Sequence, residues 1–525
     1  MCSNSDQLVA TVEQCLANSR WKQVDRDAWE NSPYKPTPTI IEAAQTLYRE
    51  HSVEDLAKSD AGQKNLSLTS DYIKNVVSTS KLNGKKSICF VTGVPGSGKT
   101  LAGLNIATEL MSASEDDQSV FLSGNGPLVD VLREALARDD VERARLNGHR
   151  LNKKEAGRKA EAFIQNIHHF RDDSLTQKVA PINKVVVFDE AQRAWNATET
   201  EKHMRMKKNV HDFDMSEPGF LLSVMDRHED WCTVICLIGG GQEINRGEAG
   251  LGEWFTSLIQ AHRDWDVHIS DALSPKDYLS AEQQRVPSDW FQTSDLHLDT
   301  SIRSFRAEHV SEFVNQLLDG DVGNAAETAR QLPRYPMVIT RDIERAKDWV
   351  RTQRRGSERS GILASSNGIR LRPHGINVKV SIDPKAWMLN GFNDVRSSDT
   401  LEEPATEFDV QGLEIDWAIV CWDANLRYST SGWESWRFKG TRWQRIKDAA
   451  QQSYLRNAYR VLLSRARQGF VIFVPNGDDT DETRPHDFYN PTYEALVAAG
   501  LEELDQPNKL TEINSQQRPN SNSNG

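Results

Sequence analysis

Hydrophobic and polar positions follow two different patterns along the chain. Up to about residue 80, apolar residues recur at spacings of three and four, as in TPTIIEAAQTLYREH. This spacing predicts helices, with Thr37 or Thr39 as an N-cap. From SICFVTG onward, short β-forming runs alternate with helix-like segments, as in SVFLSGN, KVVVFDEAQ and TVICLIGGG. Such alternation predicts parallel strands joined by crossover helices.

A second series of apolar runs follows a polar, proline-containing region. YPMVITR, SGILASSN, WAIVCWD and FVIFVP repeat the strand pattern. A chain of 525 residues also exceeds the size at which a single core usually stops growing. We therefore expect an α/β protein with two tandem domains after an N-terminal helical region. The expected boundaries are 1–80 for the helical region, 81–275 and 276–504 for the two domains, and 505–525 for a tail.

Two segments depart from the alternation. Between about 138 and 178 the polar, basic stretch RARLNGHRLNKKEAGRKAEAF carries no strand signal, so we expect a helical insertion in the first domain. The final residues, QPNKLTEINSQQRPNSNSNG, are rich in Ser and Asn and contain few apolar positions. Such composition cannot bury a core, which predicts a disordered tail.

The composition is that of an ordinary globular protein. Hydrophobic residues make up 38% and charged residues 26%, which excludes wholesale disorder. No apolar run approaches the roughly 20 residues that span a bilayer, and MCSNSDQLVA lacks a signal core. We expect a soluble, cytoplasmic protein with no membrane association. Several of the six cysteines fall in strand-like runs, which favours buried thiols over metal ligands.

The segment GVPGSGKT matches the phosphate-loop pattern G-x-x-x-x-G-K-[ST] and lies between a strand-like run and a helix-like run. Glycines let backbone N–H groups wrap phosphates, and the following helix N-terminus adds partial positive charge. Lys99 is expected to reach the β and γ phosphates of ATP, and Thr100 to hold Mg²⁺. The predicted nucleotide-binding residues here are Gly93, Gly96, Ser97, Gly98, Lys99 and Thr100.

Two further strand ends carry candidate catalytic groups. KVVVFDEAQ ends in Asp189, expected to bind Mg²⁺ through water, and Glu190, expected to orient and deprotonate the attacking water. TVICLIGGGQ places Gln242 after a strand, where its amide could contact the γ-phosphate or the water. A glycine-rich turn with an exposed glutamine is the alternative interpretation.

Two arginines in the C-terminal half of the chain could bring positive charge from the second domain to the phosphates of ATP. Arg303 of SIRSF and Arg465 of LSRARQ stand at junctions of regular elements. A supplied arginine accelerates phosphoryl transfer by about 10³ to 10⁵. Closure of a cleft on ATP would then couple hydrolysis to domain motion. The alternative is a helix whose arginines cap carbonyls or pair with acids, which we favour for Arg467.

Taken in order, GVPGSGKT, FLSGNGP, VVVFDEAQ, GGGQEI, SIRSF, TEFDVQGLEIDWAIV and YRVLLSRAR resemble the motif series of superfamily 1 DNA/RNA helicases. More narrowly, the chain is similar to the bacterial Schlafen group-3-like DNA/RNA helicase domain family over roughly residues 20 to 500. The resemblance implies two RecA-like P-loop NTPase domains with ATP between them and single-stranded DNA or RNA across their top.

The resemblance also implies roles for individual residues. Gly412 and Glu414 fall where the family contacts the γ-phosphate and the ribose of ATP, and Ser123 and Asn125 fall where it contacts the nucleic-acid backbone. Arg303 and Arg465 fall on the two γ-phosphate arginines. The chain departs from many superfamily 1 enzymes in having glycines in LIGGGQ where they have Asp. It also has Ile302 where they have Tyr.

SGWESWRFKGTRWQRIKD interleaves tryptophans with arginines and lysines. Trp433 and Trp436 are candidates for stacking on bases, while the cations neutralise phosphates. Packing of these tryptophans in the core is an equal alternative. For the basic insertion near Lys153 and Lys154, nucleic-acid binding and a charged face exposed to solvent are likewise equal alternatives. The formal net charge of −13 argues against a surface that coats nucleic acid throughout, but it permits a local basic groove.

The sequence as a whole predicts an ATP- and Mg²⁺-dependent helicase or translocase acting on DNA or RNA. A different class of protein is the alternative: a nucleotide-dependent switch ATPase that binds a partner protein, in defence or stress response, without unwinding. Oligomeric state and the choice of DNA or RNA have no signature in the sequence.

Overall fold

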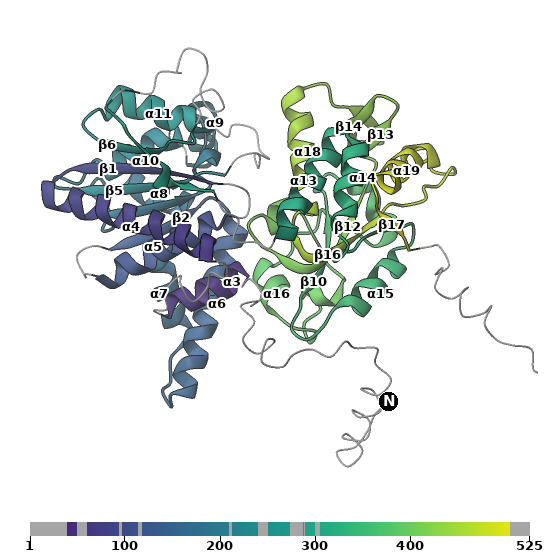
Figure 1. Ribbon diagram of the computed structural model, residues 1–525, viewed down its shortest axis with the longest axis horizontal. Helices are drawn as coiled ribbons and strands as arrows, with labels where there is room; N and C mark the ends of the chain where they lie inside the picture. The colour runs from purple at the N-terminus through teal and green to yellow at the C-terminus, as the bar shows by residue number, and fades with distance from the viewer. Residues whose placement is uncertain are drawn as a thin grey trace, which may run out of the picture. The chain divides into compact units, whose positions relative to one another are not determined.

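The computed structural model describes the chain in separate stretches. The expected tail at 505–525 and the residues before 39 lie outside them. The described residues form an α/β structure with two parallel sheets and one small antiparallel sheet (Figure 1). The ranges are 39–49, 60–93, 97–113, 118–208, 210, 213–239, 250–273, 287, 289–299 and 305–504.

The first sheet has eight strands in the order β3-β2-β4-β5-β1-β6-β7, with β8 paired to β1. All of these pairs of described strands are parallel. The apolar runs seen in the sequence form its central strands, which are buried on both faces. The strands are β1 (Lys86–Gly93), β2 (Ser119–Ser123), β3 (Ile164–Asn166), β4 (Val185–Asp189), β5 (Cys232–Leu237), β6 (Asp266–Ser270), β7 (Phe291–Thr293) and β8 (His297–Leu298).

Alternate residues of these strands enter two different hydrophobic clusters, as strand geometry requires. Cys89 and Val91 belong to one cluster, whereas Ile88 and Phe90 belong to the other. Helices therefore cover both faces of the sheet. The first cluster receives α3 (Ile40–Tyr48), α4 (Asp60–Asn83), α5 (Lys99–Ala113), α6 (Gly126–Leu146) and α7 (Lys153–Phe163); the second receives α8 (Ile167–Thr176), α10 (Glu217–Met225) and α11 (Gly250–Ala261).

The second sheet has six strands in the order β11-β10-β12-β16-β9-β17, again with parallel pairs. Helices α13 (Phe305–Asp319), α14 (Val322–Arg330), α18 (Ala449–Leu463) and α19 (Asn490–Ala498) contribute to one face, and α15 (Ile343–Gln353) to the other. The strands are β9 (Met337–Thr340), β10 (Ser360–Ala364), β11 (Pro404–Ala405), β12 (Ile415–Cys421), β16 (Ala466–Phe473) and β17 (Glu502–Glu503).

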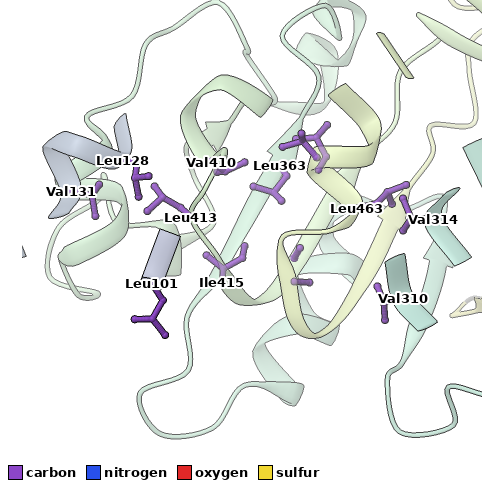
Figure 2. Packing of buried hydrophobic residues seen from close by; sticks show 14 of the residues in the cluster. Leu101, Leu128, Val131, Val310, Val314, Leu363, Val410, Leu413, Ile415 and Leu463 are labelled. Carbon is purple, nitrogen blue, oxygen red and sulfur yellow. The ribbon is translucent and has the colours of Figure 1, made fainter. Parts of the chain in front are cut away.

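One buried cluster is shared by elements of both sheets. Figure 2 shows Leu128 of α6 in the same cluster as Leu413, which precedes β12. α6 also contacts α16 (Pro384–Leu389) and α17 (Glu407–Val410). Both sheets thus belong to one compact unit, Pro38–Gly525, and the division into two domains stays a prediction. The large parallel sheet flanked by helices is consistent with a RecA-like fold.

Local predictions can be compared with these elements. Thr39 caps α3, and its side chain and that of Glu42 form a capping box. The expected helical insertion at 138–178 is mostly helical, but it also contains β3, which pairs with β2. Three residues are too few to produce a strand periodicity, so β3 could not be recognised from the sequence.

The segment that carries Trp433 and Trp436 forms an antiparallel sheet that was not predicted from the sequence. β13 (Leu426–Ser429) pairs with β14 (Gly432–Lys439), and β14 pairs with β15 (Arg442–Arg445). Gly440, in the turn between the last two strands, has a φ of 65°, a value that glycine adopts without strain. None of the helices in the described ranges combines the length and apolar character needed to cross a membrane.

Candidate functional site

The carboxyl ends of neighbouring parallel strands gather the predicted residues of the first sheet at one edge. β1 lies between β5 and β6, and β4 lies between β2 and β5. Ser123 and Asp189 are direct register partners at the ends of β2 and β4. In open α/β sheets, ligands bind outside this edge, where the strand order reverses.

The phosphate loop leaves β1 at Gly93 and enters α5 at Lys99. A Cβ atom on Gly93 would lie 2.6 Å from Ser97 Oγ and 2.8 Å from Leu298 O, so only glycine fits there. Gly98 has a φ of 83°, in the left-handed region that favours glycine. Ser97 is buried, and its hydroxyl has no hydrogen-bond partner among the described residues. The predicted Gly96 lies outside the described residues.

Lys99 stands at the first position of α5, and its Nζ donates a hydrogen bond of 2.7 Å to the carbonyl of Gly93. This bond keeps the ammonium at the carboxyl end of β1. The first N–H groups of an α-helix have no partner inside the helix, and the helix dipole places partial positive charge on them. A cation and a helix N-terminus at one loop favour an anionic ligand.

Thr100 and Asp189 form the next contact at this edge. Thr100 Oγ1 donates a hydrogen bond of 3.1 Å to Asp189 Oδ1. Burial raises the pKa of Asp189 to about 7, and the neighbouring Glu190 carboxylate adds to this increase. The hydrogen bond from Thr100 and the charges of Lys99 and Arg193 act in the opposite direction.

These groups fit a magnesium ion. A hydroxyl and a carboxylate oxygen lie within hydrogen-bonding distance of each other, and Mg²⁺ prefers hard oxygen ligands of these two kinds. A bound cation would also favour the charged form of the Asp189 carboxylate, which burial otherwise disfavours. The chemistry of the donor set therefore agrees with the ion that the sequence predicts.

Glu190 has an unusual backbone conformation. Its φ of 54° and ψ of 47° lie in the left-handed region, which costs energy for a residue with a side chain. The side-chain amide of Gln192 donates to Glu190 Oε2, and Gln192 Oε1 accepts from Gly239 N at 3.1 Å. A Cβ atom on Gly239 would lie 2.9 Å from Glu190 Oε2. The carboxylate is thus held beside the end of β5.

Gln192 is a residue at this edge whose role was not predicted from the sequence. It is buried, and both ends of its amide are used to join Glu190 to Gly239, two residues after β5. Trp254 supports the same turn, because its Nε1 donates a 2.9 Å hydrogen bond to Ala191 O. The motif DEAQ could be recognised in the sequence, but Gly239, which donates to Gln192, lies 47 positions away.

Ser123 ends β2 and Asn125 follows it, at the same edge. Both are buried, and Ser123 Oγ accepts a hydrogen bond of 3.2 Å from Asn125 N. Asn125 is the N-cap of α6, with its Oδ1 accepting from Leu128 N at 3.3 Å. Its Nδ2 donates to the carbonyl of Gln411. Contact with a nucleic-acid backbone stays a prediction for both side chains.

The second group of predicted residues lies at the amino ends of β12 and β16. Gly412 has a φ of 75°, and a Cβ atom there would lie 3.0 Å from Leu128 Cδ2 of α6. Glu414 is half-buried beside it. Ile415, the first residue of β12, pairs with Ala466, the first residue of β16. The residues just before these two strands, Glu414 and Arg465, are therefore neighbours.

Arg465 is 5% exposed, and its guanidinium binds the segment before β12. Nη1 donates to Leu413 O at 3.3 Å, Nε donates to Val461 O at 3.1 Å, and Nη2 donates to Ser464 Oγ at 3.0 Å. Arg467 instead pairs with Asp416 at 3.5 Å. At both positions these contacts match the alternative interpretation, arginines that cap carbonyls or pair with acids. Contact of Arg465 with the γ-phosphate stays a prediction. Gln242 and Arg303 lie outside the described residues.

The two tryptophans predicted to bind bases have different environments. Trp433 Nε1 donates to Leu317 O at 2.7 Å, and its ring stacks on Trp422 at a centroid distance of 5.2 Å. These contacts favour a packing role for Trp433 over stacking on a base. Trp436 is half-buried and lines a cavity. In the basic insertion, Lys153 pairs with Glu134 on α6 at 2.6 Å.

Most of the chain matches a known protein family. The family model of the Schlafen group 3 DNA/RNA helicase domain matches residues 86–476. This range runs from the first residue of β1 to just beyond β16, so it contains every described candidate residue named above. The family resemblance inferred from the sequence is confirmed. No curated protein matches the chain.

Proposed function

The chain belongs to the family of the Schlafen group 3 DNA/RNA helicase domain, and we propose that it is an ATP-hydrolysing motor that acts on single-stranded DNA or RNA. The observation that carries the proposal is the meeting of Lys99, Thr100, Asp189 and Glu190 at one edge of the first sheet. The contacts Lys99–Gly93 and Thr100–Asp189 hold these groups around the phosphate loop.

In the proposed reaction, the loop backbone and Lys99 bind the β and γ phosphates of ATP. Glu190 orients a water molecule and accepts its proton as the water oxygen attacks the γ-phosphorus. The bond between the γ-phosphorus and the bridging oxygen breaks, releasing ADP and phosphate. Thr100 and Asp189 would hold Mg²⁺, which neutralises charge on the phosphate oxygens when it is bound.

The Gln192 amide has a positioning role in this proposal. Glu190 can act as a base only if its carboxylate points consistently at the water. The hydrogen bonds from Gln192 to Glu190 and from Gly239 to Gln192 restrict that carboxylate. The left-handed backbone at Glu190 fits the same requirement, since strained residues concentrate at sites where geometry matters for function.

The segments before β12 and β16 would contribute positive charge and contacts to the nucleotide. Arg465 and Arg303 are proposed to neutralise the transferring phosphoryl group, and Gly412 and Glu414 to contact the nucleotide. Gly96 and Gln242 lie outside the described residues, and they belong to the proposal because of the sequence motifs that contain them. Arg465 Nη1 binds Leu413 O, so this arginine lies beside Gly412 and Glu414. Movement of one of these groups on hydrolysis would move the others.

The proposal is tested by measuring ATP turnover with and without single-stranded DNA and RNA oligonucleotides at low salt. A motor on nucleic acid should turn over ATP several-fold faster with at least one of them. An unchanged rate with both would contradict the motor and favour the alternative, a switch ATPase that binds a partner protein. A tailed duplex with a labelled strand then shows whether the protein unwinds.

A further inference from the structure

A cavity of about 240 Å³ opens between α17, β14 and α18, away from the phosphate loop's own strand. Three aromatic residues from these three elements line it: Phe408 of α17, Trp436 of β14 and Tyr454 of α18. Phe408 is 41% exposed, and the other two rings are half-buried. Three aromatic side chains from different elements around one cavity form a candidate surface for a flat ligand.

The Trp436 ring is held in place before any ligand binds. The guanidinium carbon of Arg427, itself a buried side chain, lies 4.6 Å from the centroid of the ring. Arg427 Nε is fixed in turn by a 2.7 Å hydrogen bond to Ala424 O. The indole Nε1 donates to Glu434 Oε2 at 3.3 Å. A fixed ring loses little conformational entropy when it stacks on a ligand.

Polar and charged groups surround the aromatic rings. Arg437 and Gln451 line the cavity and are hydrogen-bonded to each other. Glu407 also lines it, but its carboxylate accepts hydrogen bonds from Ser366 N and Oγ at 2.8 and 2.7 Å. On the hairpin of β14 and β15 the exposed cations are Arg437, Lys439, Arg442 and Arg445.

We propose that this cavity receives an unstacked base of a single nucleic-acid strand, with Phe408 and Trp436 as its stacking surfaces and the hairpin cations on the adjoining phosphates. Aromatic rings flanked by cations match the two parts of a single strand, its flat bases and its charged backbone. This inference rests on the proposed function, which it extends by naming the contact with the strand.

The position of α17 connects the cavity to the candidate nucleotide site. α17 carries Glu407 and Phe408 into the cavity and ends at Val410. The next residue, Gln411, receives the hydrogen bond from Asn125 and begins the segment that Arg465 binds at Leu413. A bound base that moved α17 would therefore also move the segment from Gln411 to Leu413, which Asn125 and Arg465 bind.

The test compares an intact oligonucleotide of about 12 nucleotides, within the range of single-strand site sizes, with an abasic strand of the same length. Fluorescence anisotropy measures both affinities, for DNA and for RNA, at one salt concentration. The wild-type protein should bind the intact strand about 5- to 150-fold more tightly, as expected from the stacking of one base. In Phe408→Ala this preference should largely disappear, whereas Phe408→Trp should retain it.

Phe392 supplies a matched control, because it is 63% exposed and does not line the cavity. Phe392→Ala should keep the full preference for the intact strand. Trp436→Phe, which keeps an aromatic ring, should also retain most of it. Thermal unfolding of each variant confirms that it folds.

Two results would count against the inference in different ways. If the wild-type protein binds strands and its ATPase is stimulated, yet Phe408→Ala keeps the full preference, the cavity does not hold a base and the proposed function stands. If no strand binds and turnover is not stimulated, the proposed function and this inference both fail.

Discussion

The side-chain amide of Asn125 donates a hydrogen bond to the backbone carbonyl of Gln411, which joins the end of β2 in the first sheet to the segment before β12 in the second. The same side chain caps α6 through Leu128 N. One residue therefore serves as a helix cap and as a link between two groups of candidate site residues.

Substitution of Asn125 by Asp separates these two roles. An aspartate can still accept from Leu128 N, but it cannot donate to Gln411 O, so a buried carbonyl loses its partner. We expect a loss of about 1–3 kcal/mol in the free energy of unfolding, measured by chemical denaturation. Asn152, the exposed N-cap of α7, offers the matched control. Asn152→Asp should change stability by less than about 0.5 kcal/mol; equal effects at both positions would contradict the link.

Glu190→Gln tests the proposed general base. The amide keeps the size of the carboxylate and can still accept from Gln192, so ATP binding should persist while hydrolysis is abolished. A fluorescent ATP analogue measures the binding and phosphate release measures the turnover. Glu201 is an exposed glutamate on α9 (Ala197–His203), and Glu201→Gln should leave both unchanged. Normal hydrolysis by Glu190→Gln would remove Glu190 from the mechanism.

Lys99→Ala should abolish hydrolysis for a different reason. It removes the cation at the start of α5 that the proposal assigns to the β and γ phosphates, so affinity for ATP should fall together with turnover. Equilibrium binding and steady-state turnover measure the two effects. Lys85, exposed just before β1, serves as the control, since Lys85→Ala should affect neither. Undiminished turnover in Lys99→Ala would overturn the assignment of the phosphate loop.

Arg465→Ala should lower ATP turnover by about 10³ or more while changing the affinity for ATP modestly, because an arginine that neutralises the transferring group acts mainly in the transition state. Arg467 is the natural control, two positions away and paired with Asp416. Arg467→Ala should turn over ATP at close to the wild-type rate. If Arg465→Ala does the same, the guanidinium only braces the segment at Leu413.

The buried pair of Arg171 and Glu217 predicts a pH dependence of stability. The side chains are 0% and 2% exposed, with Arg171 Nη1 and Glu217 Oε1 3.0 Å apart. Burial alone would raise the pKa of Glu217, but His168, Arg171 and the N–H of Trp195 together hold it below its ordinary value of 4.5. Because the folded state holds the lower pKa, this stabilisation is complete above pH 4.5 and is lost as the pH falls below it.

Glu217→Gln checks that dependence. At neutral pH it should cost about 3–5 kcal/mol, since the buried Arg171 loses the closer of its two carboxylate partners and keeps only Asp172, at 3.4 Å. Its stability should also fall less than that of the wild type between pH 5 and pH 3, a range that brackets the ordinary pKa of 4.5 for this carboxyl group. Urea denaturation across that range measures both effects. Glu229→Gln, at an exposed position, should change the free energy of unfolding by less than about 0.5 kcal/mol.

The sequence predicted best where the chemistry is local. Short contiguous motifs specify the phosphate loop, the helix after it and the acidic end of the strand. Lys99, Thr100 and Asp189 could therefore be predicted from the sequence alone. The parallel α/β class followed from alternation of strands and helices. Of the two caps expected from the sequence, Thr39 does cap a helix, and its capping partner Glu42 is only three residues away.

What the sequence missed depends on residues far apart in the chain. The role of Gln192 needs Gly239, and the packing of Trp433 needs Leu317 O and Trp422. The hairpin of β14 and β15 mixes aromatic and charged residues on both faces, so it lacks the clean alternation that marks a strand. No linear pattern specifies which distant residue will supply a partner.

The position of β1 in the middle of its sheet has a consequence for synthesis on the ribosome. Lys86 pairs with Cys232 of β5 and Ser87 with Asp266 of β6, strands that emerge much later. At a translation rate of about 5–20 residues per second, β5 is synthesised roughly 7 to 30 s after SICFVTG, and β6 later still. During that interval the nascent chain exposes an apolar segment that can aggregate. Efficient production should therefore depend on chaperones that bind this segment.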